Sequence, residues 1–404
     1  MAKQNKPAIR FKGFTDAWEQ RKVGEVSESY SGGTPSVGVK EYYGGQIPFI
    51  RSAEINSEIT ELFLTEEGLK NSSARLVAVG DILYALYGAT SGEVGRARLK
   101  GAINQAILAI KPHTDYDSEY LAQWLRKSKH SIIDTYLQGG QGNLSGTIVK
   151  ELSVDFPSLK EQKAIGGFFR QLDNLITLHQ RKYDKLQVLK KAMLEKMFPK
   201  NGSSVPEIRF KGFTDAWEQR KLSEIAGKVT EKNTGLQYVE TLTNSAEFGI
   251  ISQRDFFDHD ISKLDSLDGY YIVRNEDFVY NPRISTSAPV GPINRNKLGR
   301  TGVMSPLYTV FRPHDIDTTY LEHFFKCGYW YSFMNFNGDS GARSDRFSIK
   351  DDVFFQMPIP VPHIEEQRKI GLFLTQLDHL ITLHQRELEK LQNIKKSMLE
   401  KMFV

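Results

Sequence analysis

Two stretches of the sequence contain basic side chains and no acidic ones. Residues 94–114 include Arg96, Arg98, Lys100 and Lys111, and residues 278–314 include Arg283, Arg295, Lys297, Arg300 and Arg312. Ammonium and guanidinium groups bind phosphate, and arginine also binds the edges of bases. Both stretches therefore predict the binding of a nucleic acid rather than the making or breaking of bonds. The alternative is that they are ordinary solvated loops.

Two pairs of loops carry the polar residues that could read bases. One pair follows two matching segments that are predicted to be buried strands, Asp81–Tyr84 and Asp277–Tyr280, and its two loop sequences differ. The other pair, 139–145 and 338–344, keeps the spacing G-x-x-G-x-x-S while the residues between the glycines change. Glycine lets a backbone approach a ligand closely, and Gln, Asn and Arg can each bind a base through two hydrogen bonds. An ordinary glycine turn before the last strand is the alternative for the second pair.

The residues predicted to contact DNA come from these loops and from the basic stretches. They are Tyr87, Thr90, Ser91, Arg96, Arg98, Gln141, Asn143, Arg283, Ser285, Thr286, Arg295, Arg343 and Arg346.

The patterns that could signal catalysis are incomplete. Residues 281–284, NPRI, resemble an adenine methyltransferase motif but lack its second proline and its base-stacking aromatic residue. Residues 33–40, GTPSVGVK, differ from a phosphate-binding loop because Val39 separates the second glycine from Lys40. Cys327 is the only cysteine, so a cysteine zinc site would lack ligands. We expect no catalytic residue, metal or cofactor in this chain.

An internal repeat organises the whole sequence. Residues 9–22, IRFKGFTDAWEQRK, recur without change at 208–221, and residues 161–198 closely match residues 366–403. The chain therefore has the order A–B–A′–B′, with two different A units and two similar B units. Such an arrangement predicts one pseudo-symmetric molecule in which each half does the same work once.

The B units are predicted to be long helices. Apolar residues and one histidine recur every seven positions, at Ile165, Leu172, His179, Leu186 and Met193 in the first copy and at Ile370, Leu377, His384, Leu391 and Met398 in the second. Such a seam needs a partner, and the pseudo-two-fold favours antiparallel pairing of the two copies. Ser158 and Glu161 predict a capping box at the start of the first helix, and His363 predicts a weaker cap in the second. A purely structural coiled coil is the alternative for the helices alone.

The A units show short β-rich runs broken by Gly, Pro and Asn, with a few helices, so the expected fold class is α+β. The predicted organisation consists of two pseudo-symmetric domains joined by two long antiparallel coiled-coil-like helices. Its segments are a flexible N-terminus (1–8), a first domain (9–157), a first helix (158–198), a linker (199–207), a second domain (208–362) and a second helix (363–403).

Composition limits the class of protein. The net charge is +4, and residues 1–157 balance at 18 basic and 18 acidic side chains, so the globular parts alone should hold DNA weakly. Residues 158–198 are more basic, with 9 basic and 4 acidic side chains. We find no long apolar window and no secretory signal, so we expect a cytoplasmic protein without a membrane segment.

On these motifs the sequence resembles the specificity subunits of type I restriction–modification enzymes. The resemblance rests on the A–B–A′–B′ plan, on SGGTP at 31–35, on YGATSG at 87–92, and on the P-x-x-x-E-Q-x-x-I helix openings at 157–165 and 362–370. It implies that each A unit is a target recognition domain for one half of a gapped, bipartite DNA site. The helices would set the gap and dock two modification (methyltransferase) subunits.

The resemblance also implies partners and cofactors. Double-stranded DNA, the two modification subunits and the restriction (translocase and endonuclease) subunits would be the partners, whereas S-adenosylmethionine, ATP and Mg would be bound only by those subunits. Two other functions remain open from the residues: an autonomous DNA methyltransferase or nuclease with fused specificity, and a structural coiled-coil adaptor.

Overall fold

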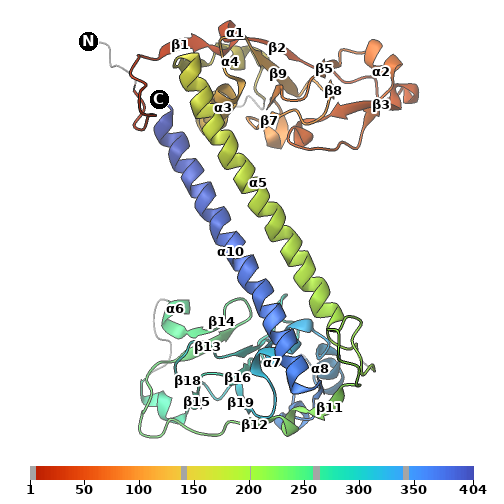
Figure 1. Ribbon diagram of the computed structural model, residues 1–404, viewed down its shortest axis with the longest axis vertical. Coiled ribbons are helices and arrows are strands. Elements are labelled where there is room, and N and C mark those ends of the chain that lie inside the picture. Colours follow the sequence, from red (N-terminus) through yellow and green to blue (C-terminus); the bar gives the residue numbers. More distant parts are fainter. Residues whose placement is uncertain (1–5, 138–142, 201, 258–263, 340–344) are drawn as a thin grey trace. The chain divides into compact units, whose positions relative to one another are not determined.

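The structure is a computed structural model that describes residues 6–137, 143–200, 202–257, 264–339 and 345–404 (Figure 1). Two compact units share the chain. The first unit comprises Met1–Gln180 with Arg386–Val404, and the second comprises Arg181–Gln385. Each unit therefore contains one sheet-rich domain and one half of each long helix.

The first unit is built on two four-stranded sheets. One has the order β2-β9-β6-β7 and the other β4-β3-β8-β5, while β1 pairs with β10 beside them. The strands are β1 (Glu19–Lys22), β2 (Ser27–Ser31), β3 (Tyr43–Ile50), β4 (Phe63–Leu64), β5 (Arg75–Val77), β6 (Ile82–Ala85), β7 (Val94–Arg96), β8 (Gly101–Ile103), β9 (Ile107–Pro112) and β10 (Ser153–Phe156). Its helices are α1 (Val23–Val26), α2 (Glu66–Lys70), α3 (Ser118–Tyr136) and α4 (Gly146–Glu151). All four residues of β6 are buried because apolar clusters cover both of its faces.

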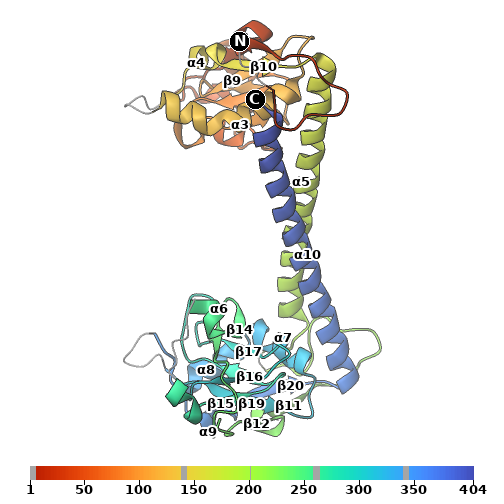
Figure 2. The same ribbon diagram turned by 90° about the vertical axis from the view of Figure 1, so that its left-hand side faces the viewer.

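The second unit repeats the main sheet in the order β12-β19-β16-β17 (Figure 2). Its strands are β11 (Glu218–Lys221), β12 (Ala226–Lys228), β13 (Leu242–Ser245), β14 (Gly249–Ser252), β15 (Tyr271–Val273), β16 (Phe278–Tyr280), β17 (Ile293–Arg295), β18 (Gly302–Met304), β19 (Thr309–Pro313) and β20 (Pro358–Val361). Its helices are α6 (Gln253–Phe257), α7 (Thr318–Cys327), α8 (Tyr331–Asn337) and α9 (Asp351–Phe354).

Matching registers make residues of the two units directly comparable. In the first unit Ile82 pairs with Arg96 and with Ile110, and in the second Phe278 pairs with Arg295 and with Phe311. The outer pairs agree as well, since Glu19 faces Phe156 and Glu218 faces Val361. The α+β class and the pseudo-symmetry expected from the sequence are confirmed.

The B units form α5 (Leu159–Lys196) and α10 (Ile364–Met402). In the first unit the beginning of α5 packs against the end of α10: Phe169 stacks on Phe403, and Lys395 contacts Asp173 at 2.5 Å. In the second unit the end of α5 packs against the beginning of α10, where Lys190 contacts Asp378. The helices are antiparallel in each unit, as the seam predicts. Their apolar residues divide between two separate cores, one in each unit.

The openings of the two helices differ from the expected capping box. The Ser158 hydroxyl accepts a hydrogen bond from the Glu161 amide at 3.4 Å, as predicted. The Glu161 carboxylate, however, accepts two hydrogen bonds from Arg10 at 2.6 and 2.8 Å instead of reaching back to the cap. Arg209 binds the fully buried Glu366 in the same way. A buried carboxylate needs a charged partner, so the repeated segments containing Arg10 and Arg209 anchor the two helix openings.

Candidate nucleic-acid interface

The two predicted loops of the first unit meet. Tyr87, just after β6, forms an antiparallel β-bridge with Asn143, just before α4. The Leu144 amide also donates to the Leu86 carbonyl oxygen at 3.0 Å. Tyr87 is 36% exposed and Asn143 is exposed as well, so both side chains can reach a ligand.

Equivalent loops meet in the second unit, but Arg346 lies two residues beyond the segment 338–344 that the glycine spacing had matched with 139–145. Arg283, just after β16, forms an antiparallel β-bridge with Arg346. The Phe347 amide donates to the Pro282 carbonyl oxygen at 2.7 Å, which is the counterpart of the contact between Leu144 and Leu86. Tyr87 and Arg283 therefore occupy equivalent places, and so do Asn143 and Arg346.

The smaller polar residues of these loops divide into two groups. Ser285 and Thr286 are exposed, and the Ser285 hydroxyl lies 3.2 Å from that of Ser287. Ser91 is only 6% exposed, and its hydroxyl donates to the Leu86 carbonyl oxygen. Thr90 is half-buried and donates to the Tyr87 carbonyl oxygen at 3.4 Å. Ser91 and Thr90 thus hold the shape of the loop that presents Tyr87.

Most of the basic side chains are paired with acids from elsewhere in the chain. Arg96 and Arg295, at equivalent ends of β7 and β17, donate at 2.8 Å to Ser118 and Thr318 at the starts of α3 and α7. The other ion pairs are Arg98 with Glu58, Lys111 with Asp81, Lys297 with Glu322, Arg300 with Glu240, and Arg312 with Asp277. Most cations of the acid-free stretches are therefore paired within the fold, which favours structural roles for Arg96 and Arg295.

Arg283 and Arg346 differ from these side chains. Both are exposed, and neither makes an ion pair with any residue that the structure describes. Arg346 also borders a groove whose lining includes Lys228, Tyr271 and Tyr308. Gln141 and Arg343, two further predicted contact residues, lie outside the described residues.

The ion pairs around Arg295 predict an acid-sensitive fold in the second unit. Burial alone would raise the pKa of Glu322, but Lys326 and Lys297 outweigh burial and lower this pKa to about 2. Arg295 lies 2.7 Å from the same carboxylate. Because the folded pKa lies below the unfolded one, the stabilisation is complete above about pH 4.5 and is lost as the pH falls towards 2. The ionised Glu322 carboxylate stabilises the folded state by about 3 kcal/mol.

Urea unfolding of the full chain and of Glu322→Gln, followed by tryptophan fluorescence from pH 6 to pH 2.5, measures this contribution. The variant is expected to be less stable at pH 6 and to lose less stability on acidification. Parallel losses in the two proteins would show that Glu322 is not the group responsible.

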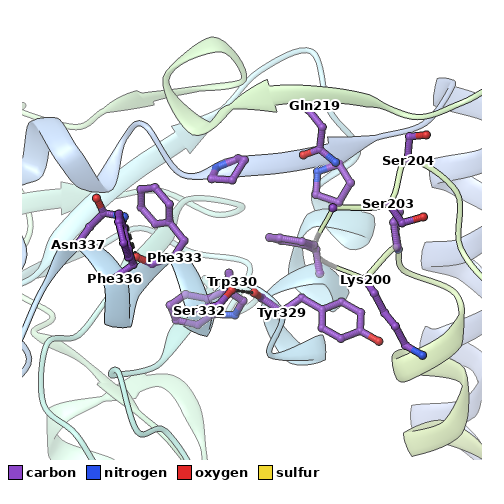
Figure 3. A pocket seen from close by; sticks show the side chains of 15 residues that line it. Lys200, Ser203, Ser204, Gln219, Tyr329, Trp330, Ser332, Phe333, Phe336 and Asn337 are labelled. Atoms are coloured by element: carbon purple, nitrogen blue, oxygen red, sulfur yellow. Dashed lines mark hydrogen bonds between the residues drawn. The ribbon is translucent and has the colours of Figure 1, made fainter.

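The main hollow of the second unit lies apart from the bridged loops. Its lining includes Tyr329, Trp330 and Phe333 from the region of α8, together with Lys200 and Ser203 of the linker (Figure 3). Its walls are mainly aromatic side chains and prolines.

Among the described residues, no three His, Cys, Asp or Glu side chains gather as a metal site would require. No helix in the described part of the chain is long and apolar enough to cross a membrane.

One surface escaped the sequence analysis. Leu175 and Leu178 of α5 are 44% and 47% exposed, and the equivalent Leu380 and Leu383 of α10 are 41% and 45% exposed. All four lie in the repeated segment LITLHQR, off the seven-residue seam. Leucines at these off-seam positions in both copies were the signal that could have revealed an exposed apolar face.

Comparison with known proteins agrees with this arrangement. The family model for the type I restriction modification DNA specificity domain matches residues 15–188 and 214–393. The type I restriction enzyme MjaVIII specificity subunit of Methanocaldococcus jannaschii is 24% identical over 400 residues, which cover 95% of this chain and 91% of that protein. The MjaIX specificity subunit of the same organism is 32% identical over 189 residues, covering 44% of this chain and 42% of that one.

A solved structure shares the fold. The S subunit of a type I restriction-modification system from M. genitalium superposes with a TM-score of 0.59 at 15% identity, covering 99% of both chains. The role of this chain is thus DNA recognition, with catalysis in other subunits, and not that of an enzyme with fused specificity or of a plain adaptor. With both of its repeats matched, the chain belongs to the family of type I restriction modification DNA specificity domains.

Proposed function

We propose that each unit reads one half of a gapped, bipartite DNA site through its pair of bridged loops. The observation that carries this proposal is the equivalence of two positions on matching frames: Tyr87 and Asn143 in one unit, Arg283 and Arg346 in the other. Matching strand registers with different side chains at exposed loop positions are what two different half-sites require, because contacts to bases determine the sequence that is read and contacts to phosphates only position the protein. Gln141 and Arg343 remain proposed DNA contacts on the sequence alone.

Affinity for DNA has to come largely from partner subunits. Arg98, Lys111, Arg300 and Arg312 are paired with carboxylates, so the two basic stretches offer few free cations to replace the counterions of the duplex. Two modification subunits that close around the DNA would supply the missing contacts. S-adenosylmethionine belongs to these subunits, and ATP and Mg belong with the restriction subunits that complete the system. The cytoplasm is the proposed place of action because the substrate is the cell's DNA.

The exposed leucine pairs are the proposed docking points for the modification subunits. Leu175 with Leu178 and Leu380 with Leu383 are spaced three residues apart, so each pair lies on one face of its helix. An apolar face of this kind fits an amphipathic helix of a partner. Two equivalent pairs predict two equivalent partners, one for each repeat.

Double substitutions test this assembly. The chain is co-expressed with its modification subunit, and native mass spectrometry counts the subunits bound. Leu175→Ser with Leu178→Ser is expected to leave one modification subunit bound, and adding Leu380→Ser with Leu383→Ser is expected to leave none. Each leucine should contribute about 1–2 kcal/mol, because its surface is already half buried. Adenine methylation of plasmid DNA should appear only in complexes that contain the modification subunit.

Val188 offers a matched control. It is an apolar α5 residue that is 71% exposed, but the equivalent residue of α10 is Asn393, so the repeat does not keep it apolar. Val188→Ser should therefore bind two modification subunits as the unaltered chain does. If the double leucine variants keep full helical circular dichroism and still bind two subunits, docking occurs elsewhere.

A further inference from the structure

Two like charges lie side by side on the second unit. Arg283 and Arg346 are partners on an isolated antiparallel β-bridge. The Cα atoms of such partners lie about 4.5–5.5 Å apart, and like charges placed directly opposite one another destabilise the pair. A ligand that accepts from both guanidinium groups would offset this repulsion.

No acid within the described residues relieves this repulsion. The neighbouring residue Asp345 pairs through its backbone, since its carbonyl oxygen accepts from the Ile284 amide at 3.0 Å. No ion pair joins its carboxylate to either arginine among the residues that the structure describes. Arg295, Arg300 and Arg312 of the same stretch are all paired with carboxylates. The bridge thus concentrates free guanidinium donors at one point of the unit.

The chemistry of the guanidinium group indicates the ligand. Arginine presents a planar fork of N–H donors that fits the O6 and N7 acceptors of guanine in the major groove, while asparagine fits N6 and N7 of adenine. We propose, resting on the function proposed above, that Arg283 and Arg346 read guanines of two base pairs in the half-site of the second unit. At the equivalent place the first unit has Tyr87 and Asn143, and Asn143 reads an adenine.

Phosphate is the competing ligand for the two arginines, and the repeat argues against it. Every half-site has the same phosphate backbone, so a phosphate contact at this point of the frame should be basic in both units. In the first unit, however, the residues equivalent to Arg283 and Arg346 are the uncharged Tyr87 and Asn143. Base contacts, in contrast, are expected to differ between units that read different sequences.

Substitution of the arginines, followed by methylome sequencing of cells that express the chain with its modification subunit, tests the proposal. Arg346→Ala should relax one position of the second half-site from guanine to any base, and Arg283→Ala should relax another. At the relaxed position, the preference for guanine over the other bases should fall about ten- to hundredfold. Arg346→Lys keeps the charge but loses the fork, so it should also relax that position. The first half-site should remain unchanged in all three.

The controls separate the possible failures. Arg300→Ala removes another exposed arginine, which is paired with Glu240, and it should leave the recognition sequence unchanged. If both alanine variants weaken methylation of all sequences equally and Arg346→Lys restores it, the arginines bind phosphate and this inference is overturned. If Asn143→Ala then still relaxes an adenine in the first half-site, the proposed function survives. If no substitution in either pair changes any base, the bridged loops do not read DNA and the proposed function fails as well. Equal melting temperatures of the purified variants exclude misfolding.

Discussion

A chain in which residues 222–361 replace residues 23–156 is expected to direct methylation to a gapped palindrome made of two copies of the second half-site. The original asymmetric site should no longer be methylated. This result is expected if each unit carries its own pair of reading loops on a frame that fits either position in the chain.

The contacts at both junctions support the exchange. Lys22 faces Ser153 and Lys221 faces Pro358 in matching registers, so the cuts fall at equivalent points of paired strands. Behind them, Gln162 accepts from the Asp117 amide at 2.8 Å and Gln367 accepts from the Asp317 amide at the same distance. The incoming domain can therefore form the same hydrogen bond with the glutamine of the helix opening in its new position.

One contact does not match and shapes the design of the experiment. His323 lies 3.1 Å from the Thr375 hydroxyl, and burial lowers the pKa of this histidine to about 3, so it is neutral. In the exchanged chain the residue equivalent to Thr375 is Arg170. We therefore expect the exchange to be more stable with Arg170→Thr than without it. Methylome sequencing of both versions provides the readout, and a folded, active exchange protein that still methylates only the original site would contradict the modular interpretation.

Lengthening both long helices at the division between the units is expected to widen the gap in the recognition site. The division falls after Gln180 in α5 and after Gln385 in α10. Four residues inserted at each place move the remainder of the helix by about 6 Å along its axis and turn it by roughly forty degrees. DNA advances about 3.4 Å per base pair. The gap should grow by one or two base pairs while both half-sites keep their bases.

The insertion leaves the two helix cores intact. Phe169, Leu172 and Phe403 belong to one core in the first unit, whereas Leu374, Leu377 and Phe198 belong to one core in the second, and all of these residues lie away from the insertion points. Insertion into α5 alone should instead mismatch the antiparallel pairing and lower the melting temperature. An active double-insertion protein whose methylated sites keep the original gap would show that the helices do not set the spacing.

The sequence was sufficient to predict the architecture. Strict repetition of IRFKGFTDAWEQRK and a seam of period seven are local, one-dimensional signals, and they correctly predicted two equivalent domains and two antiparallel helices. The buried strand Ile82–Ala85 and its counterpart Phe278–Tyr280 were found for the same reason, since a run of consecutive apolar residues reports burial on both faces.

Charge and side-chain accessibility were decided only by the tertiary structure. The acid-free stretches looked basic, yet Asp81 neutralises Lys111, Asp277 neutralises Arg312, and Arg295 turns inwards to Glu322. Likewise, Glu161 does not complete the expected capping box, because its carboxylate binds Arg10, which is 151 residues away in the chain. Ion pairs form between side chains that folding brings together, and a charge count along the sequence contains no information about such distant partners. For the same reason, the pairing of Arg283 with Arg346 could not be predicted from the sequence. The β-bridge between them appears only in the tertiary structure, and neither arginine pairs with an acid in the described part of the chain.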